Sequence, residues 1–164
     1  MYPSILSDKG VTATPLRVPR GNSSYGEIQL VLPLLNWLAR RGRLRVGARV
    51  HQEFNWFGRR VDLVTLTASN VIVSYELKLA GLGRALEQAA LNRMSFDRSY
   101  VVTGSQPRPS NVAIAREVGV GIIVIEESGV KQVAHSPLLR AERTVRQRLV
   151  KRLHDSDGHW VSRV

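Results

Sequence analysis

The sequence predicts an α/β protein with a central mixed β-sheet of about five strands flanked by helices. Two patterns alternate along its 164 residues: apolar positions at helical spacing, and short apolar, β-branched runs that are typical of strands. Between residues 24 and 133 they follow the order α-β-β-β-α-β-α-β. A basic helix is expected after this core, and a hydrophobic fraction of 43% suits one domain.

The composition restricts the compartment and the chemistry. The chain has no cysteine, which excludes disulfide frameworks and zinc–thiolate sites and is compatible with a reducing cytoplasm. No apolar run approaches the roughly 20 residues that span a bilayer. The start of the chain resembles neither a signal peptide nor a transit peptide. We therefore expect a cytoplasmic protein with no membrane partner.

The net charge indicates a polyanionic partner. Lysine and arginine number 24 against 13 acidic residues, so the formal net charge is +11 and the isoelectric point about 11.2. Such an excess is expected of proteins that bind the phosphate backbone of nucleic acids. An acidic membrane surface or an acidic protein partner could also account for it.

The N-terminal part changes character at residue 23. Residues 1–22 contain three prolines and little periodicity, and we interpret them as an arm. A helix is expected from there to residue 41, with Gly42 as its stop and Pro33 as a kink or a division. Near its start, Ser24 and Glu27 fit a capping box, in which the glutamate side chain reaches back to the cap amide.

A strand is expected over residues 49–57. Alternation places His51 and Glu53 on one face of it, and Phe54 and Trp56 on the other. A single histidine or glutamate on a strand is more often solvated than a ligand, so neither is assigned a function.

A β-hairpin follows, and it is the centre of the functional prediction. Two apolar, β-branched runs at 61–67 and 71–79 flank a polar break centred on Ser69. With the turn at that residue, the numbers of directly opposed residues add up to 138. Asp62 is therefore expected to face Glu76.

Two opposed carboxylates, with Cβ atoms about 5 Å apart, repel each other unless a cation or a shared proton relieves them. Mg²⁺ suits such a pair, and Lys78 points into the same space. A solvated polar face with a Glu–Lys pair is equally supported by the spacing alone. The shared face carries Arg60, Asp62, Val64, Leu66, Ile72, Ser74, Glu76 and Lys78, and the expected core face carries Val61, Leu63, Thr65, Val71, Val73, Tyr75, Leu77 and Leu79.

The second half of the core alternates helices and strands. A helix over residues 84–94 places Arg84, Gln88 and Asn92 on one polar face. The other expected elements are a strand at 99–103, a helix at 110–118, and strands at 121–126 and 130–133.

A basic amphipathic helix is predicted over residues 138–153, with Pro137 in its first turn. It could contact a DNA backbone, or it could pack on the body and leave its basic face in solvent. The segment after it is expected to be a polar tail. The chain thus divides into an arm at 1–22, a core domain at 23–135, and a basic helix and tail at 136–164.

The motifs of several common enzyme classes are absent from the sequence. It contains no GxxxxGK[ST], GxSxG, HExxH or paired CxxC. This excludes the usual nucleotide-hydrolase, esterase and zinc-protease functions.

In their order and spacing, the acidic and basic residues of the core resemble the PD-(D/E)XK nuclease superfamily. That superfamily includes restriction endonucleases, Holliday-junction resolvases and recombination exonucleases. The resemblance covers about residues 24–133, with Val61 where the motif's name has proline and Asn92 where some exonuclease-like members have tyrosine. The residues that carry it are Glu27, Asp62, Glu76, Leu77, Lys78 and Gln88.

The resemblance implies a restriction-endonuclease-like core and a metal-dependent nuclease. Lys78 would position or activate the attacking water, and Gln88 matches a polar residue on the following helix of several subgroups. The implied cofactor is Mg²⁺, for which Mn²⁺ can substitute. Its implied ligands are Asp62, Glu76, the carbonyl of Leu77, and Glu27.

The expected function is therefore hydrolysis of DNA, rather than RNA, by a metal-activated water. The alternatives are a nucleic-acid-binding module with a nuclease fold but no turnover, or a basic structural subunit of a nucleoprotein complex. The arm or the C-terminal helix could supply a homodimer surface. The residues expected to contact the DNA backbone are Arg59, Arg60, Arg84, Arg93, Arg143 and Arg146.

Overall fold

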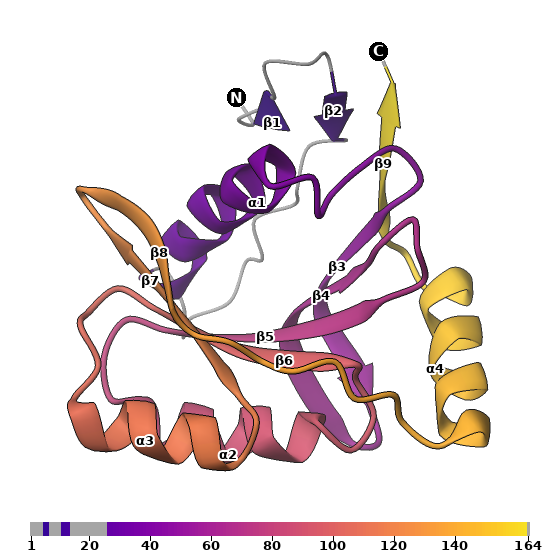
Figure 1. Cartoon of the computed structure of the whole chain (residues 1–164). Coiled ribbons are helices and arrows are strands. Elements are labelled where there is room, and N and C mark those ends of the chain that lie inside the picture. Colours follow the sequence, from indigo (N-terminus) through magenta and orange to yellow (C-terminus); the bar gives the residue numbers. More distant parts are fainter. Residues whose placement is uncertain (1–4, 7–10, 14–25, 164) are drawn as a thin grey trace.

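The computed structural model describes residues 5–6, 11–13 and 26–163, which form one open β-sheet with helices on both faces (Figure 1). The strands are β1 (Ile5–Leu6), β2 (Val11–Ala13), β3 (Arg49–Trp56), β4 (Arg59–Leu66), β5 (Ile72–Lys78), β6 (Arg98–Thr103), β7 (Gly121–Glu126), β8 (Gly129–Ala134) and β9 (His159–Arg163). The helices are the 3₁₀ helix η1 (Glu27–Leu30), α1 (Val31–Arg40), α2 (Leu82–Asn92), α3 (Pro109–Glu117) and α4 (Arg143–Asp155).

The strands lie in the order β1-β2-β9-β3-β4-β5-β6-β7-β8. β3, β4 and β5 are antiparallel, β5, β6 and β7 are parallel, and β8 returns antiparallel beside β7. Parallel neighbours need a crossover, which α2 and α3 supply. The predicted alternation of helices and strands is confirmed. The sheet is larger than expected because β9, β2 and β1 extend it beyond β3.

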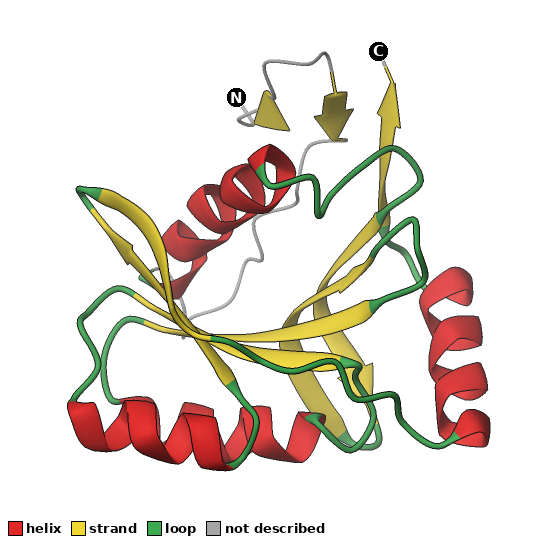
Figure 2. Cartoon of the chain, viewed as in Figure 1, coloured by secondary structure: helices red, strands yellow, loops and turns green. Residues whose placement is uncertain are grey.

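The helices bury both faces of the sheet (Figure 2). α1 packs on one face, over Leu63, Tyr75 and Val102. α2 and α3 cover β6 and β7 on the other face, and α4 covers β3 to β5 there. In the described part of the chain, no helix is long and apolar enough to cross a membrane.

The hairpin register is confirmed. Leu63 lies opposite Tyr75, and every residue pair between β4 and β5 has numbers that add up to 138. The turn is closed by the Thr67 N–H, which donates to the carbonyl of Val71 at 2.9 Å. Asn70 takes the left-handed conformation (φ 59°) that a tight turn requires and that asparagine tolerates.

The expectation that only one face of the hairpin is core was wrong. Val64, Leu66 and Ile72, on the face expected to be polar, are buried. They pack against Leu149 and Leu153 of α4, a helix more than seventy residues further along the chain. The alternation of side chains within the hairpin cannot predict that a distant helix packs on its second face.

The expected alternation along β3 is broken at Glu53, which has a left-handed backbone (φ 49°). The rings of His51 and Phe54 contact each other with centroids 5.6 Å apart, although their numbers differ by three. On β4, Val61 and Val64 likewise join one apolar cluster. Beyond this point, the side chains that face α4 are therefore those of the other parity on both strands, and Val61 leaves the core face predicted for it.

The first helix begins later than expected. Glu27 is the first residue of η1, Gly26 precedes it, and Ser24 of the predicted capping box lies outside the described residues. α1 starts at Val31, so Pro33 falls in its first turn. The N–H groups of the first turn have no α-helical partner, so the missing N–H of proline costs no hydrogen bond there. Gly42 (φ 67°) follows the helix, as predicted.

The C-terminal helix also begins later than predicted, at Arg143. The physical reason is a cap: the Glu142 carboxylate accepts hydrogen bonds from the N–H groups of Thr144 and Val145, at 3.0 and 3.2 Å. Pro137 lies in the loop that leads to it rather than in its first turn.

A fully buried carboxylate, Asp97, holds this helix to the sheet. It accepts hydrogen bonds from the backbone N–H of Ile72 at 2.8 Å and from Arg146 Nη1 at 3.0 Å. Arg146 also donates to the carbonyl of Asn70 in the hairpin turn. α4 is therefore a packing helix, and apart from Arg146 its arginines and its lysine are exposed.

The predicted polar tail was wrong for residues 159–163, which form β9 beside β3 and β2. Gly158 precedes it and lies directly against the ring of His51, where a Cβ atom would collide with the ring. Of the predicted N-terminal arm, only β1 and β2 are described, and β2 pairs with β9.

Candidate active site

A cleft of about 430 Å³ opens where β4, β5, η1 and α2 meet. It brings together residues that are as far as 65 positions apart in the chain, from the first residue of η1 to the last of α2. The residues that line it are Glu27, Arg59, Arg60, Asp62, Glu76, Leu77, Lys78, Arg84, Gln88 and Asn92.

Asp62 lies where the pairing of β4 with β5 stops, one residue beyond Leu63. Its Oδ2 accepts a hydrogen bond from the backbone N–H of Leu77 at 2.8 Å, so the side chain is held beside β5. Burial raises its pKa, and the negative charge of Glu27 adds to the effect. The Leu77 N–H and the charges of Arg60 and Lys78 oppose the rise.

Glu76 is 4% exposed, and Asn92 Nδ2 donates to its Oε1 at 2.7 Å. Burial and the charge of Asp62 raise the pKa of Glu76 to about 8, and the two carboxyls approach closely enough to share a hydrogen bond. The predicted convergence of Asp62 and Glu76 is therefore present in the structure. At neutral pH this pair keeps a proton unless a cation neutralises it.

The oxygen atoms around this pair suit a hard divalent cation. Asp62 and Glu76 offer two carboxylates, and Leu77, which also lines the cleft, offers a carbonyl; these are the ligand types that Mg²⁺ accepts beside water and phosphate oxygens. Among the described residues, no group of three or more His, Cys, Asp or Glu side chains is arranged to hold a metal.

Lys78 and Glu27 form an ion pair across the cleft, with Lys78 Nζ 2.7 Å from Glu27 Oε1. The side chains are 38% and 23% exposed. Gly26, which precedes Glu27, lies against the side chain of Leu79 at the end of β5. In this structure the Glu27 carboxylate holds the lysine, whereas the family resemblance implied a metal ligand.

The cationic rim of the cleft comes from two elements. Arg59 and Arg60 are the first residues of β4, and Arg84 lies in the first turn of α2. Arg60 is 3.5 Å from Glu53, an exposed contact that contributes little. Glu53, the residue with the left-handed backbone, lies on β3, which is the neighbour of β4.

One face of α2 points into the cleft. Arg84, Gln88 and Asn92, at intervals of four residues, all line it, as the helical period indicates. Asn92 is a site residue that the sequence interpretation placed on this face without giving it a role. Its position one turn after Gln88 was the signal that could have identified it as the partner of Glu76.

Three arginines expected to contact DNA lie elsewhere. Arg93 Nη1 donates to the carbonyls of Asp97 and Pro137, both at 2.9 Å, which ties the end of α2 to the loop before α4. Arg146 bonds the buried Asp97, and Arg143 is exposed at the start of α4. None of the three lines the cleft.

No protein-family model matches the chain, and no curated protein matches it. Among solved structures, a protein of unknown function from Silicibacter pomeroyi has a TM-score of 0.58 at 16% identity, over 80% of this chain and 86% of that one. A repair endonuclease from Pyrococcus abyssi has a TM-score of 0.45 at 15% identity, over 75% of this chain and 65% of that one. The first likeness shows a shared α/β fold, and the second is too distant to carry an argument.

Proposed function

We propose that the protein is a nuclease of the PD-(D/E)XK type, which hydrolyses DNA phosphodiester bonds with Mg²⁺, or with Mn²⁺ in its place. The observation that carries the proposal is the convergence of the buried Glu76 with the half-buried Asp62, both with raised pKa values, beside Lys78 and a rim of arginines. Paired carboxylates with perturbed pKa values in a cleft are typical of functional sites.

Asp62, Glu76 and the Leu77 carbonyl would hold the ion. When bound, a divalent cation polarises the scissile phosphate and lowers the pKa of a bound water. A bound cation would compete with the proton that the carboxyl pair keeps, so the affinity for metal would rise with pH.

Lys78 is the group that orients the attacking water and offsets negative charge on the phosphate. Its ammonium is held by Glu27 at 2.7 Å, so Glu27 acts in the proposal as a positioning residue for Lys78. Asn92 has the matching role for Glu76, because its side-chain amide fixes one carboxylate oxygen at 2.7 Å and leaves the other for the ion.

The substrate backbone would lie along Arg59, Arg60 and Arg84. These guanidiniums border the carboxyl pair on two sides, from the start of β4 and from the first turn of α2. A guanidinium can bind phosphate oxygens in a bidentate manner, which makes arginine suited to this rim.

The proposal is tested by cleavage of linear, nicked, branched and single-stranded DNA with Mg²⁺ or Mn²⁺. Asp62→Asn and Lys78→Met are expected to lower the rate about 100-fold or more, since each removes a group that acts on the reacting centre. DNA binding in EDTA should persist in both variants. Arg116→Gln, at an exposed position of α3, serves as the control that keeps full activity.

Two outcomes would contradict this function. If the wild-type protein cuts none of these substrates, a binding module without turnover replaces the nuclease. If the two variants cut as fast as the wild type, the activity comes from another site or another protein.

A further inference from the structure

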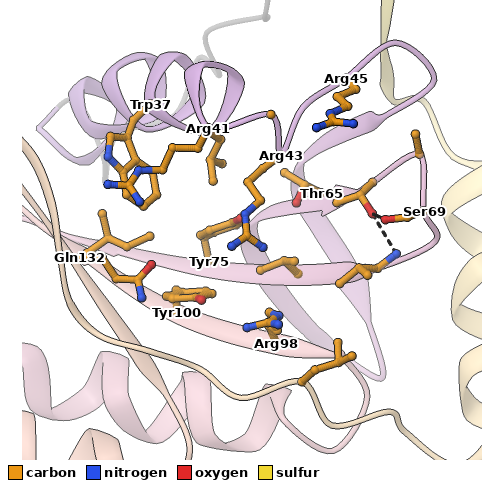
Figure 3. A pocket seen from close by; sticks show the side chains of 18 residues that line it. Trp37, Arg41, Arg43, Arg45, Thr65, Ser69, Tyr75, Arg98, Tyr100 and Gln132 are labelled. Carbon is orange, nitrogen blue, oxygen red and sulfur yellow. Dashed lines mark hydrogen bonds between the residues drawn. The ribbon is translucent and has the colours of Figure 1, made fainter.

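A second, larger hollow lies on the opposite face of the sheet, between α1, the hairpin turn of β4 and β5, and β8 (Figure 3). Its volume is about 580 Å³, within the range of ligand pockets of about 300 to 1,000 Å³. It shares no lining residue with the carboxylate cleft. We call it the arginine pocket, after Arg41, Arg43, Arg45 and Arg98, which line it.

No described acidic side chain compensates the charge of the arginine pocket. Its described lining includes four guanidiniums and no aspartate or glutamate. Among the described residues, none of the ion pairs includes any of these four arginines. Four like charges around one cavity repel one another, and a bound anion relieves that repulsion.

Arg98 shows how the pocket is built to present positive charge. Its Nη1 donates to the carbonyl of Ser136 at 2.6 Å and lies 2.8 Å from His135 Nε2, which fixes the side chain at the floor. Its Nε is buried and has no hydrogen-bond partner among the described residues. Burial lowers the pKa of His135, and the charges of Arg98 and Arg43 lower it further, so the imidazole adds no positive charge to the four guanidiniums.

Flat aromatic surfaces lie among these cations. The guanidinium of Arg41 lies over the Trp37 ring, 4.5 Å from its centroid. Tyr75 and Tyr100 stack with centroids 5.8 Å apart and an angle of 18° between the rings. Figure 3 shows Arg43 reaching from the loop after α1 towards Tyr75, with Arg98 near Tyr100.

We propose that the arginine pocket binds a nucleotide, either free or as an unpaired nucleotide of a single DNA strand. Guanidiniums bind the phosphate, while Trp37 with Arg41 offers a plane on which a base stacks, and the buried tyrosine pair forms an apolar floor. A site for inorganic phosphate alone needs no aromatic planes, and a site for duplex backbone alone needs no enclosed volume. Hydroxyl and amide groups of Ser69 and Gln132 complete the lining for contacts to a base or sugar.

The test is calorimetric titration in EDTA with three probes: deoxythymidine monophosphate, oligothymidylate and inorganic phosphate. The variant is the double change Arg41→Gln and Arg43→Gln, at two exposed positions. The control is Arg108→Gln with Arg116→Gln, which removes the same charge from exposed positions outside both the pocket and the cleft.

We expect the pocket variant to bind oligothymidylate about tenfold more weakly or worse, with the control unchanged. If the monophosphate binds saturably and competes with oligothymidylate, a free nucleotide is sufficient as the ligand. If oligothymidylate binds and the monophosphate does not, the ligand is a nucleotide of a single strand. Asp62→Asn should bind both probes like the wild type, because the pocket does not depend on the proposed hydrolysis.

Three results would overturn the proposal. Equal weakening in the pocket variant and the control shows a general charge effect. Inorganic phosphate that binds as tightly as the monophosphate shows that the base contributes nothing. Unchanged binding in the pocket variant shows that nucleotides do not enter the pocket.

Discussion

At the scale of single residues, the protonation of Glu76 affects both the stability of the protein and the metal binding proposed for this residue. The burial that makes the β5 strand part of the core also raises the pKa of this carboxyl to about 8, together with the charge of Asp62. A folded protein that holds a proton which the unfolded chain releases loses stability as the pH rises.

The first prediction concerns this proton. In EDTA, the free energy of unfolding should fall between about pH 4.5 and about pH 8, by at most about 1.4 kcal/mol per pH unit for one proton. Below this range both states are protonated at Glu76, and above it both are ionised, so the slope ends. Urea unfolding at a series of pH values measures it.

Glu76→Gln should remove this slope, because glutamine does not titrate, while exposed Glu117→Gln should leave it unchanged. Added Mg²⁺ should stabilise the wild type more at the upper end of the range than at the lower, since protons compete with the ion. Parallel pH profiles for wild type and Glu76→Gln would contradict the cause assigned to the shift.

At the scale of elements, α4 closes the hairpin from the face that alternation alone would leave in solvent. Its apolar stripe buries Leu149 and Leu153 completely against β3 to β5. Asp97 and Glu142 act beside this contact, one as a buried partner of Arg146 and the other as the cap. The sheet that positions Asp62 and Glu76 therefore depends on this helix.

Leu149→Ala should accordingly lower the free energy of unfolding by about 2 to 5 kcal/mol, because it leaves a cavity between α4 and the sheet. Arg148→Ala, on the exposed side of the same turn, is the matched control and should change stability by less than about 0.5 kcal/mol. Urea denaturation of the three proteins makes the comparison. Equal stability of Leu149→Ala and wild type would show that α4 does not stabilise the hairpin.

At the scale of the whole molecule, only part of the positive charge lies at the two sites, the carboxylate cleft and the arginine pocket, although the net charge is +11. The carboxylate cleft has a rim of Arg59, Arg60 and Arg84. Other arginines are engaged in the fold, as Arg93 and Arg146 show. Total charge is therefore a poor measure of how many phosphates the protein contacts.

The salt dependence of binding to duplex DNA separates these groups. Each phosphate contact contributes about −0.9 to the slope of log affinity against log salt, so Arg59→Gln with Arg84→Gln should reduce the slope by about 2. Arg108→Gln with Arg116→Gln should leave it unchanged. Fluorescence anisotropy with labelled duplex at several salt concentrations measures both, and equal slopes would exclude the rim as the contact surface.

Several features follow from local sequence pattern. The turn at Ser69 determines the register of β4 and β5, because an antiparallel pair has no freedom once its turn is placed. The helical period likewise places Arg84, Gln88 and Asn92 on one side of α2. Both are short-range rules, and both brought the predicted residues to one cleft.

Other features could not be obtained this way because they join residues distant along the chain. One is the packing of α4 on the second face of the hairpin, and another is the contact of Glu27 with Lys78. A third is the bonding of Arg93 to carbonyl groups and of Arg146 to a carboxylate. Each depends on where a crossover or a loop brings its helix. The left-handed Glu53 changes the faces of two strands with no local signal in its neighbours.

The sequence by itself determined the order of the elements, the pairing of the central hairpin and the meeting of Asp62 with Glu76, since turn position and side-chain period decide these locally. The tertiary structure decided that Glu76 of this pair is buried, that Asn92 holds Glu76 and Glu27 holds Lys78, and that four arginines line a second pocket. Burial and charge environment are properties of packed surfaces, which form only when distant segments meet.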